Sequence, residues 1–388
     1  MRTLVLSVVF SSVSVVFSAP LRLIDPSPSV AGGFGAAVAV SGSLAFVGAP
    51  GSDDAGEDAG AVHVYADGVY VQTIHGPSKG ARFGTALAAS GPYLVVGAPN
   101  SEGSGEVRVF EGPPGAMRET AALRPDASNP GMRFGDAVAI EGGTIVVGAP
   151  LASSPMGPTG MGFVFERSPE GGFVLQQRLI AIGIPSGGGL GASVAIRAGR
   201  IAMGAPYLAA EFLPGRVATF LRTSGGWVRG AEVRSPVGTP RDRFGRSVAL
   251  VNGELLVGAP RDLVLSRGLL CTFRPRTAPG GDETWESTDV QLSPDAAPFD
   301  RFGFALETDG NRMVVGAPSA EPGGRAWVYR LEQGRWVADR ELVADVSPGF
   351  TLYGAKVGIS GRTVVVGAQL DDGVAEDAGA AFLFDVGE

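Results

Sequence analysis

Residues 34–50 read FGAAVAVSGSLAFVGAP, and this stretch decides how the chain folds. It opens with an aromatic residue and a glycine, runs through small and β-branched residues to Ser41-Gly42, and ends in a second hydrophobic run closed by Gly48-Ala49-Pro50. Short β-branched runs on either side of residues that tolerate positive φ are typical of β-hairpins. The stretch therefore predicts two antiparallel strands joined by a tight turn.

This pattern recurs along the whole chain. The opening aromatic or Leu, each followed by Gly, stands at Phe34, Phe83, Phe134, Leu190, Phe244, Phe302 and Tyr353, and the closing glycines at Gly48, Gly97, Gly148, Gly204, Gly258, Gly316 and Gly367. The closing motif is Gly-Ala-Pro except in the last copy, where Gln369 replaces Pro. The opening residue precedes the closing glycine by 14 positions in every copy, whereas successive copies start 49 to 58 residues apart. A fixed core with variable connections indicates one structural unit repeated seven times.

Two further strands are predicted in each repeat except the last. After Gly-Ala-Pro, a loop of variable length leads to a third strand such as Ala61–Tyr65, and a turn at Asp67-Gly68 leads to a fourth, Val71–Ile74. Four antiparallel strands repeated about every 50 residues are typical of a propeller blade. The sequence therefore predicts an all-β, seven-bladed β-propeller over residues 19–388.

The two ends of the chain predict how the ring closes. The seventh repeat stops after its third strand, Ala380–Phe384, whereas Leu21–Asp25 resembles the fourth strand that precedes each opening motif. If Leu21–Asp25 completes the last blade, no strand edge is left unpaired there. We expect this N-terminal strand to close the ring.

Residues 1–18 have the features of a secretory signal peptide. A single positive charge, Arg2, precedes an apolar run, Leu4–Phe17, and small residues precede Ala19, so we expect cleavage after Ser18. The run is shorter than the roughly 20 residues of a membrane-spanning helix; an uncleaved anchor is the alternative. We therefore expect a secreted, periplasmic or other cell-envelope protein without a transmembrane segment in the mature chain.

Composition argues against several classes of function. The net charge of −8 disfavours nucleic acid or an anionic membrane as a partner. With Cys271 as the only cysteine, no intramolecular disulfide can form, and His63 and His75 are too few for a zinc cluster. No sequence feature places a nucleophile beside a base. We therefore expect a protein that is not an enzyme and has no cofactor, apart from the weak Ca²⁺ site considered below.

The seven motifs resemble the FG–GAP repeats of integrin α-chain propellers and of many bacterial exported proteins. The resemblance implies a binding or adhesion module, often one that depends on Ca²⁺. Calcium-binding members carry an Asp-rich loop between the first and second strands, which suits a cation that needs six to eight oxygen ligands. Here every such connection is a turn of two or three residues, such as Ser41-Gly42, so the Ca²⁺ ligands of the family correspond to no position in this chain.

Two acidic loops are the only candidate metal site. They follow the first and seventh closing motifs, and the candidate ligands are Asp53, Asp54, Asp58, Asp371, Asp372 and Asp377. Because the first and seventh blades become neighbours when the ring closes, we expect the two loops to lie side by side. They would form a weak, shared Ca²⁺ site, a solvated acidic edge, or a docking spot for a basic partner.

The variable loops suggest where recognition takes place. Loops between strands two and three, and between strand four and the next blade, share one face of a propeller, and a rigid scaffold often presents binding residues on such loops. We expect a non-catalytic binding or adhesion module for an extracellular protein or glycan. The alternatives are a propeller hydrolase or lyase with carboxylates near the central channel, and a structural unit of an envelope assembly. The arginines that directly precede an opening Phe are expected to form interblade hydrogen bonds: Arg82, Arg133, Arg243 and Arg301.

Overall fold

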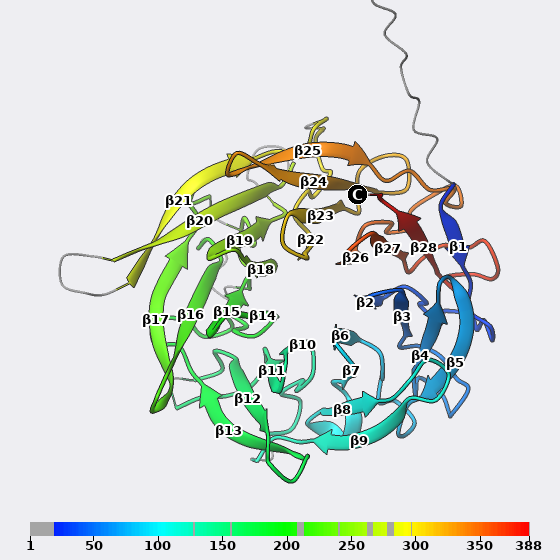
Figure 1. Cartoon of the computed structure of the whole chain (residues 1–388), viewed down its shortest axis with the longest axis horizontal. Helices are drawn as coiled ribbons and strands as arrows, with labels where there is room; N and C mark the ends of the chain where they lie inside the picture. The colour runs from blue at the N-terminus through cyan, green and yellow to red at the C-terminus, as the bar shows by residue number, and fades with distance from the viewer. Residues whose placement is uncertain are drawn as a thin grey trace, which may run out of the picture.

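The computed structural model describes residues 19–126, 129–155, 157–207, 213–239, 241–261, 267–277, 283–295 and 297–387. Seven four-stranded antiparallel sheets stand around a central axis (Figure 1), which confirms the predicted seven-bladed propeller. Within these ranges, no helix has the length and apolar character needed to cross a membrane. The predicted signal peptide, residues 1–18, lies outside the described residues.

In the first four blades, the strands run outward from the axis in chain order. Blade 1 contains β2 (Ala37–Ser41), β3 (Leu44–Ala49), β4 (Ala61–Ala66) and β5 (Val69–His75). Blade 2 contains β6 (Ala86–Ser90), β7 (Tyr93–Ala98), β8 (Glu106–Glu111) and β9 (Arg118–Leu123), with a short 3₁₀ turn, η1 (Ser101–Gly103), before β8. Blade 3 contains β10 (Ala137–Glu141), β11 (Thr144–Ala149), β12 (Met161–Arg167) and β13 (Phe173–Leu179). Blade 4 contains β14 (Ser193–Arg197), β15 (Arg200–Ala205), β16 (Arg216–Thr223) and β17 (Gly226–Arg234).

The last three blades continue this order until the ring closes. Blade 5 contains β18 (Ser247–Val251), β19 (Glu254–Ala259), β20 (Leu269–Thr277) and β21 (Glu283–Gln291). Blade 6 contains β22 (Ala305–Thr308), β23 (Arg312–Ala317), β24 (Arg325–Glu332) and β25 (Arg335–Glu341). Blade 7 contains β26 (Lys356–Ser360), β27 (Thr363–Ala368), β28 (Ala380–Asp385) and, as its outermost strand, β1 (Leu21–Leu23).

The N-terminal strand closes the ring as predicted. β1 pairs antiparallel with β28, with Arg22 opposite Phe382, and the two strands lie side by side in Figure 1. The strand is shorter than the predicted Leu21–Asp25. It ends at Leu23 because the chain then turns toward blade 1, where the Ile24 carbonyl accepts a hydrogen bond from the Tyr65 hydroxyl (2.6 Å). The closing strand therefore contacts both of the blades that meet at the closure.

The repeated motif forms the joint between neighbouring blades. The Gly84 N–H donates to the Gly97 carbonyl of its own blade (3.1 Å), while the Gly84 carbonyl faces Gly48 of blade 1 so closely that a Cβ at Gly48 would overlap it. The same close approach occurs at all seven boundaries: Gly48–Gly84, Gly97–Gly135, Gly148–Gly191, Gly204–Gly245, Gly258–Gly303, Gly316–Gly354 and Gly367–Gly35. Only glycine allows backbones this close, so the fixed 14-residue spacing is a property of the joint.

The core is divided into layers between the blades. The opening residue of each motif is buried at a boundary, and the five phenylalanines and Leu190 have no exposed surface. Phe83, for example, packs edge-on against Phe110 with the ring centres 6.0 Å apart, and joins a cluster with Val62 and Phe46 of blade 1. Burial of these large side chains between blades provides much of the hydrophobic stabilisation and leaves the axis of the ring open.

Candidate functional site

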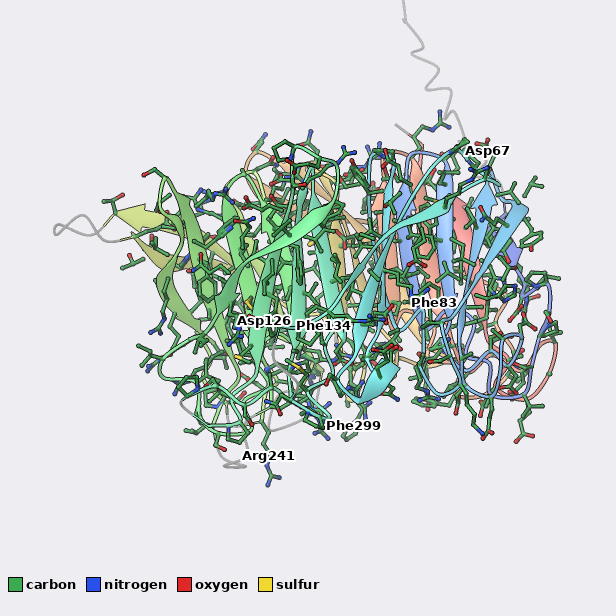
Figure 2. All side chains as sticks on the ribbon, turned by 90° about the horizontal axis from the view of Figure 1, so that it is seen from below. Asp67, Phe83, Asp126, Phe134, Arg241 and Phe299 are labelled. Carbon is green, nitrogen blue, oxygen red and sulfur yellow. The ribbon has the colours of Figure 1, made fainter. Side chains whose placement is uncertain are left out.

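The two faces of the ring differ in their surface. We call the side with the connections between strands two and three, and between strand four and the next blade, the loop face; the opposite side is the turn face. Figure 2 shows Phe299 and Arg241 on the loop face and Asp67 on the turn face. Among the described residues, large exposed hydrophobic side chains lie in outer strands or on the loop face, and none lies in a turn of the turn face. Those on the loop face are Ile24, Val30, Leu151, Ile182, Tyr207, Leu213, Val237, Leu292, Phe299, Val343, Phe350 and Val374.

The two acidic loops share a local structure. In the first, the Asp53 carboxylate accepts a hydrogen bond from the Asp58 N–H (2.9 Å), and in the seventh, Asp372 accepts one from the Asp377 N–H (2.8 Å). Asp58 and Asp377 both have positive φ, 52° and 49°. In each loop, one predicted metal ligand is therefore already occupied in holding the loop closed.

Three of the other four predicted ligands have protein partners of their own, and one of the three, Asp371, is fully buried. Asp371 forms a salt bridge with Arg22 and accepts hydrogen bonds from the Ser347 N–H (2.8 Å) and hydroxyl (3.0 Å), so it fixes β1 and the loop before blade 7. Asp54 accepts a hydrogen bond from the Ser27 hydroxyl (2.8 Å), and Asp58 pairs with Arg82 (3.2 Å).

The segment before β2 links the acidic loops, as Ser27 contacts the first and the Ala31 N–H donates to the Glu376 carbonyl of the other (3.1 Å). Within the described ranges, no group of three or more His, Cys, Asp or Glu side chains is arranged to hold a metal ion. The structure thus places the six residues near the closure without gathering them, and the shared Ca²⁺ site stays a prediction.

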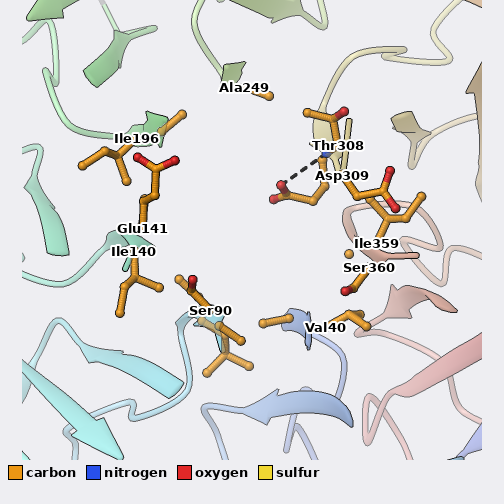
Figure 3. Close-up of a pocket in the computed structure, with 18 of the residues that line it drawn as sticks. Val40, Ser90, Ile140, Glu141, Ile196, Ala249, Thr308, Asp309, Ile359 and Ser360 are labelled. Atoms are coloured by element: carbon orange, nitrogen blue, oxygen red, sulfur yellow. Dashed lines mark hydrogen bonds between the residues drawn. The ribbon is translucent and has the colours of Figure 1, made fainter. Parts of the chain in front are cut away.

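The open axis of the ring is a continuous channel lined by the first strand of every blade. Its end on the turn face is a cavity of about 480 Å³, where Glu141 and Asp309 project from opposite sides (Figure 3). Its mouth on the loop face is a cavity of about 450 Å³ lined by Arg82, Arg133, Arg246 and Lys356. Arg246 and Lys356 also line the middle of the channel, together with Glu307. The channel thus has a basic mouth and a turn-face end that contains carboxylates.

Two charged residues of the lining depart from the repeat. At the first position of the inner strand, blades 1 to 6 carry Ala or Ser: Ala37, Ala86, Ala137, Ser193, Ser247 and Ala305. Blade 7 carries Lys356 there, opposite Gly367 as the others lie opposite their closing glycine. Two positions further on, blade 6 carries Glu307 where the other blades carry Ala or Gly. Neither residue stands out within a single repeat, but an alignment of the seven inner strands identifies both.

The channel changes the ionisation of both residues. Glu307 is open to the lumen but enclosed by protein, so its carboxyl is largely desolvated. Desolvation raises the pKa of this carboxyl to about 7, although the hydrogen bond that it accepts from the Thr308 N–H (3.2 Å) lowers the pKa. Desolvation and the charge of Arg246 lower the pKa of Lys356 to about 8, although the charge of Asp136 opposes the shift. Groups with perturbed pKa values in a cavity are candidates for function.

The expectation for the repeated arginines is wrong in part. Arg82 pairs across the blade boundary with Asp58 (3.2 Å), but Arg133 binds Asp136 of its own blade. Within the described residues, Arg243 and Arg301 form no side-chain hydrogen bond or ion pair. What repeats at this position is the backbone conformation, since all four arginines have φ between 55° and 58°. The side chains are therefore free to differ between blades.

The buried His63 and Cys271 belong to the scaffold. The His63 Nδ1 lies 3.0 Å from the Thr73 hydroxyl and its Nε2 lies 3.4 Å from Asp25, beneath the closing strand. Burial raises the pKa of Cys271 to about 12, so the thiol stays protonated and unreactive, as expected for a packing residue.

Comparison with known families agrees with this architecture. Three segments match the FG-GAP repeat: residues 23–65, 117–165 and 336–384. Each match begins in or next to the fourth strand of one blade and ends in the third strand of the next. The first match accordingly begins in β1, the fourth strand of blade 7, and ends in β4, the third strand of blade 1. No curated protein is found to match the chain.

Proposed function

Because the chain is an FG-GAP repeat protein, we propose that it is a non-catalytic binding or adhesion module that holds an extracellular protein or glycan partner on its loop face. The observation that carries this proposal is the uneven distribution of exposed apolar surface. Phe299 and Phe350, whose side chains are 63% and 59% exposed, lie in loops that precede first strands. Exposed aromatic residues gathered on one face are typical of interaction sites.

The test compares the loop face with the outer surface of the ring. The test variant combines Phe299→Asp and Phe350→Asp. The matched control combines Val69→Asp and Val174→Asp on outer strands, where the side chains are also exposed. Each purified protein is used as bait in the extracellular fraction of its source organism. We expect wild type and control to retain the same partner, and the loop-face variant to lose it. Equal capture by all three proteins, or loss in the control alone, contradicts the proposal.

Export is part of the same proposal. Residues 1–18 would direct the chain out of the cytoplasm and be removed, so that the mature protein begins at Ala19. N-terminal sequencing of the protein recovered from the extracellular or periplasmic fraction tests this. Recovery from the cytoplasm with Met1 intact would contradict it.

A hydrolase or lyase is the second candidate, and Glu307 is the observation that favours it. A carboxyl with a pKa of about 7 can donate and accept a proton near neutral pH. Such an enzyme would place its substrate in the channel and lose its activity in Glu307→Gln. If screening with polysaccharide substrates finds an activity that survives this substitution, Glu307 is not its acid or base.

A further inference from the structure

A group of positive charges without partners lies at and beside the mouth of the channel on the loop face. Arg246 and Lys356 line the mouth cavity, whereas Arg243, Arg261 and Arg301 lie at the loop-face ends of blades 5 and 6. Within the described residues, the following side chains form neither a hydrogen bond nor an ion pair: Arg243, Arg246, Arg261, Arg301 and Lys356. We call these five residues the cationic mouth. The chain has 39 acidic and 31 basic residues, so carboxylates are not scarce. Of the other basic residues in the described ranges, Arg118, Arg197 and Arg335 also form neither, whereas most of the rest are paired.

Several of these side chains lie close enough to repel one another. Burial and the charges of Arg261, Arg246 and Arg301 lower the pKa of Arg243, and the charge of Arg246 acts in the same direction on Lys356. All five are partly buried, so water screens this repulsion less than it screens charges on an open surface. Arg246 is additionally held in place over the Phe304 ring, 4.1 Å from its centre.

Few carboxylates are available to balance these charges. Among the described residues that line the mouth cavity, Asp136 alone is acidic, and it is hydrogen-bonded to Arg133. Deeper in the channel, Glu307 lines the same section as Arg246 and Lys356 but forms an ion pair with neither, and its carboxyl has a pKa raised to about 7. The nearby Asp242 is buried, and its carboxylate accepts hydrogen bonds from the Gly215 and Phe244 N–H groups (3.0 and 2.9 Å). The N–H donors of the cationic mouth therefore remain available to a group from outside the chain.

Stability does not account for this arrangement. Lys356 replaces the Ala or Ser of the other six blades. A half-buried ammonium without a partner costs free energy, whereas the small residue used elsewhere does not. A departure from the repeat that costs stability and is placed in a cavity points to ligand binding.

We propose that the cationic mouth binds an acidic segment of a protein partner, whose Asp or Glu carboxylates enter the channel from the loop face. The proposal rests on the proposed function and names the chemistry of its partner. Planar guanidinium groups bind carboxylates through paired hydrogen bonds, and arginines that converge from blades 5 and 6 surround such a group from more than one side.

A protein segment fits the surroundings better than an acidic glycan does. The mouth is bordered by the exposed side chains of Leu151 and Tyr207, and Phe299 and Phe350 stand elsewhere on the same face. Arginine and aromatic side chains are both enriched in protein interfaces and in their energetic hot spots. The apolar residues then exclude water from the ion pairs at the centre.

The probe for the test is fluorescein-labelled decaglutamate, titrated with the purified mature protein and followed by fluorescence anisotropy at low and high salt. The test variant is Arg261→Ala with Arg301→Ala. The control is Arg118→Ala with Arg335→Ala, exposed positions on the outer strands β9 and β25, which changes the net charge equally. We expect the test variant to bind about tenfold more weakly and the control to change by about twofold or less. Binding should weaken as salt rises.

Every other result overturns the inference. It is wrong if wild type does not bind decaglutamate, or if test and control variants weaken equally. It is also wrong if hexagalacturonate, an acidic glycan probe, binds tighter than the peptide, since the occupant is then a glycan. Capture of the native partner separates this failure from failure of the proposed function. If capture of the partner depends on Phe299 and Phe350 but not on Arg261 and Arg301, the loop face is the binding surface and the cationic mouth is not part of it.

Discussion

The joints between the blades and the channel that they enclose differ in how strictly they follow the repeat. Every joint is the same contact, in which a glycine of one blade meets the carbonyl of a glycine in the next, as at Gly97 and Gly135. The channel lining follows the repeat in most positions but departs from it at Lys356 and Glu307. The two glycines of each joint are the same in all seven repeats, so a charged departure next to them indicates a role other than folding.

The largest effect should come from breaking one joint. Gly97 has no positive φ, so in Gly97→Ala only the overlap of the new Cβ with the Gly135 carbonyl matters. We expect the free energy of unfolding to fall by roughly 3 kcal/mol or more, because neither backbone can move without disturbing its sheet. Gly172→Ala is the control, since that position is open. Denaturant unfolding measures both, and equal losses would show that the joint is not special.

A smaller effect is expected at the closing strand, which is the only outer strand donated from the other end of the chain. Leu23 is buried against blades 1 and 7, whereas Leu21 on the same strand is 46% exposed. Leu23→Ala should lower the free energy of unfolding by about 2–4 kcal/mol, and Leu21→Ala by much less.

Removal of residues 19–26 should destabilise the whole domain. Melting of the truncated protein at the same temperature as the mature chain would exclude closure by β1.

The closure should also depend on pH. Burial lowers the pKa of His63 below its ordinary 6.5, although Asp25 opposes the shift. The folded state therefore takes up the proton less readily than the unfolded state, so this contribution to stability is complete above pH 6.5 and is lost as the pH falls below it. We expect wild type to lose stability between pH 7 and about 5.5 more steeply than His63→Gln. The charge of His75 also lowers the pKa of His63, so His75→Gln is no neutral control. A wild-type slope in His63→Gln refutes the assignment.

The smallest effect concerns the acidic loops that flank the closure. Calorimetric titration with Ca²⁺ should give at most one weak site, with a Kd on the order of millimolar, which Asp54→Ala with Asp372→Ala abolishes. Absence of heat would leave the loops as a solvated acidic edge. Several tight sites would contradict the interpretation of the two-residue turns between the first and second strands.

The sequence was sufficient for the fold because the glycines that form each joint are also the residues that make the repeat visible. It was less informative about the site. Asp371 pairs with Arg22, 349 positions away in the chain, and nothing local marks Asp371 as different from Asp372. The cationic mouth is defined by the absence of partners for Arg261 and Arg301, which only the packed ring reveals. The sequence alone is sufficient to identify Lys356 as unusual, because the six equivalent residues are Ala or Ser.

Thermal unfolding of Lys356→Ala tests the central claim most directly, because the substitution restores the residue of the repeat. If Lys356 is present for binding, removal of a half-buried ammonium that Arg246 repels should leave the melting temperature unchanged or raise it by about 1 °C or more. If Lys356 instead holds the blades together, the melting temperature falls by roughly 3 °C or more, and the distinction between uniform joints and a functional lining is wrong.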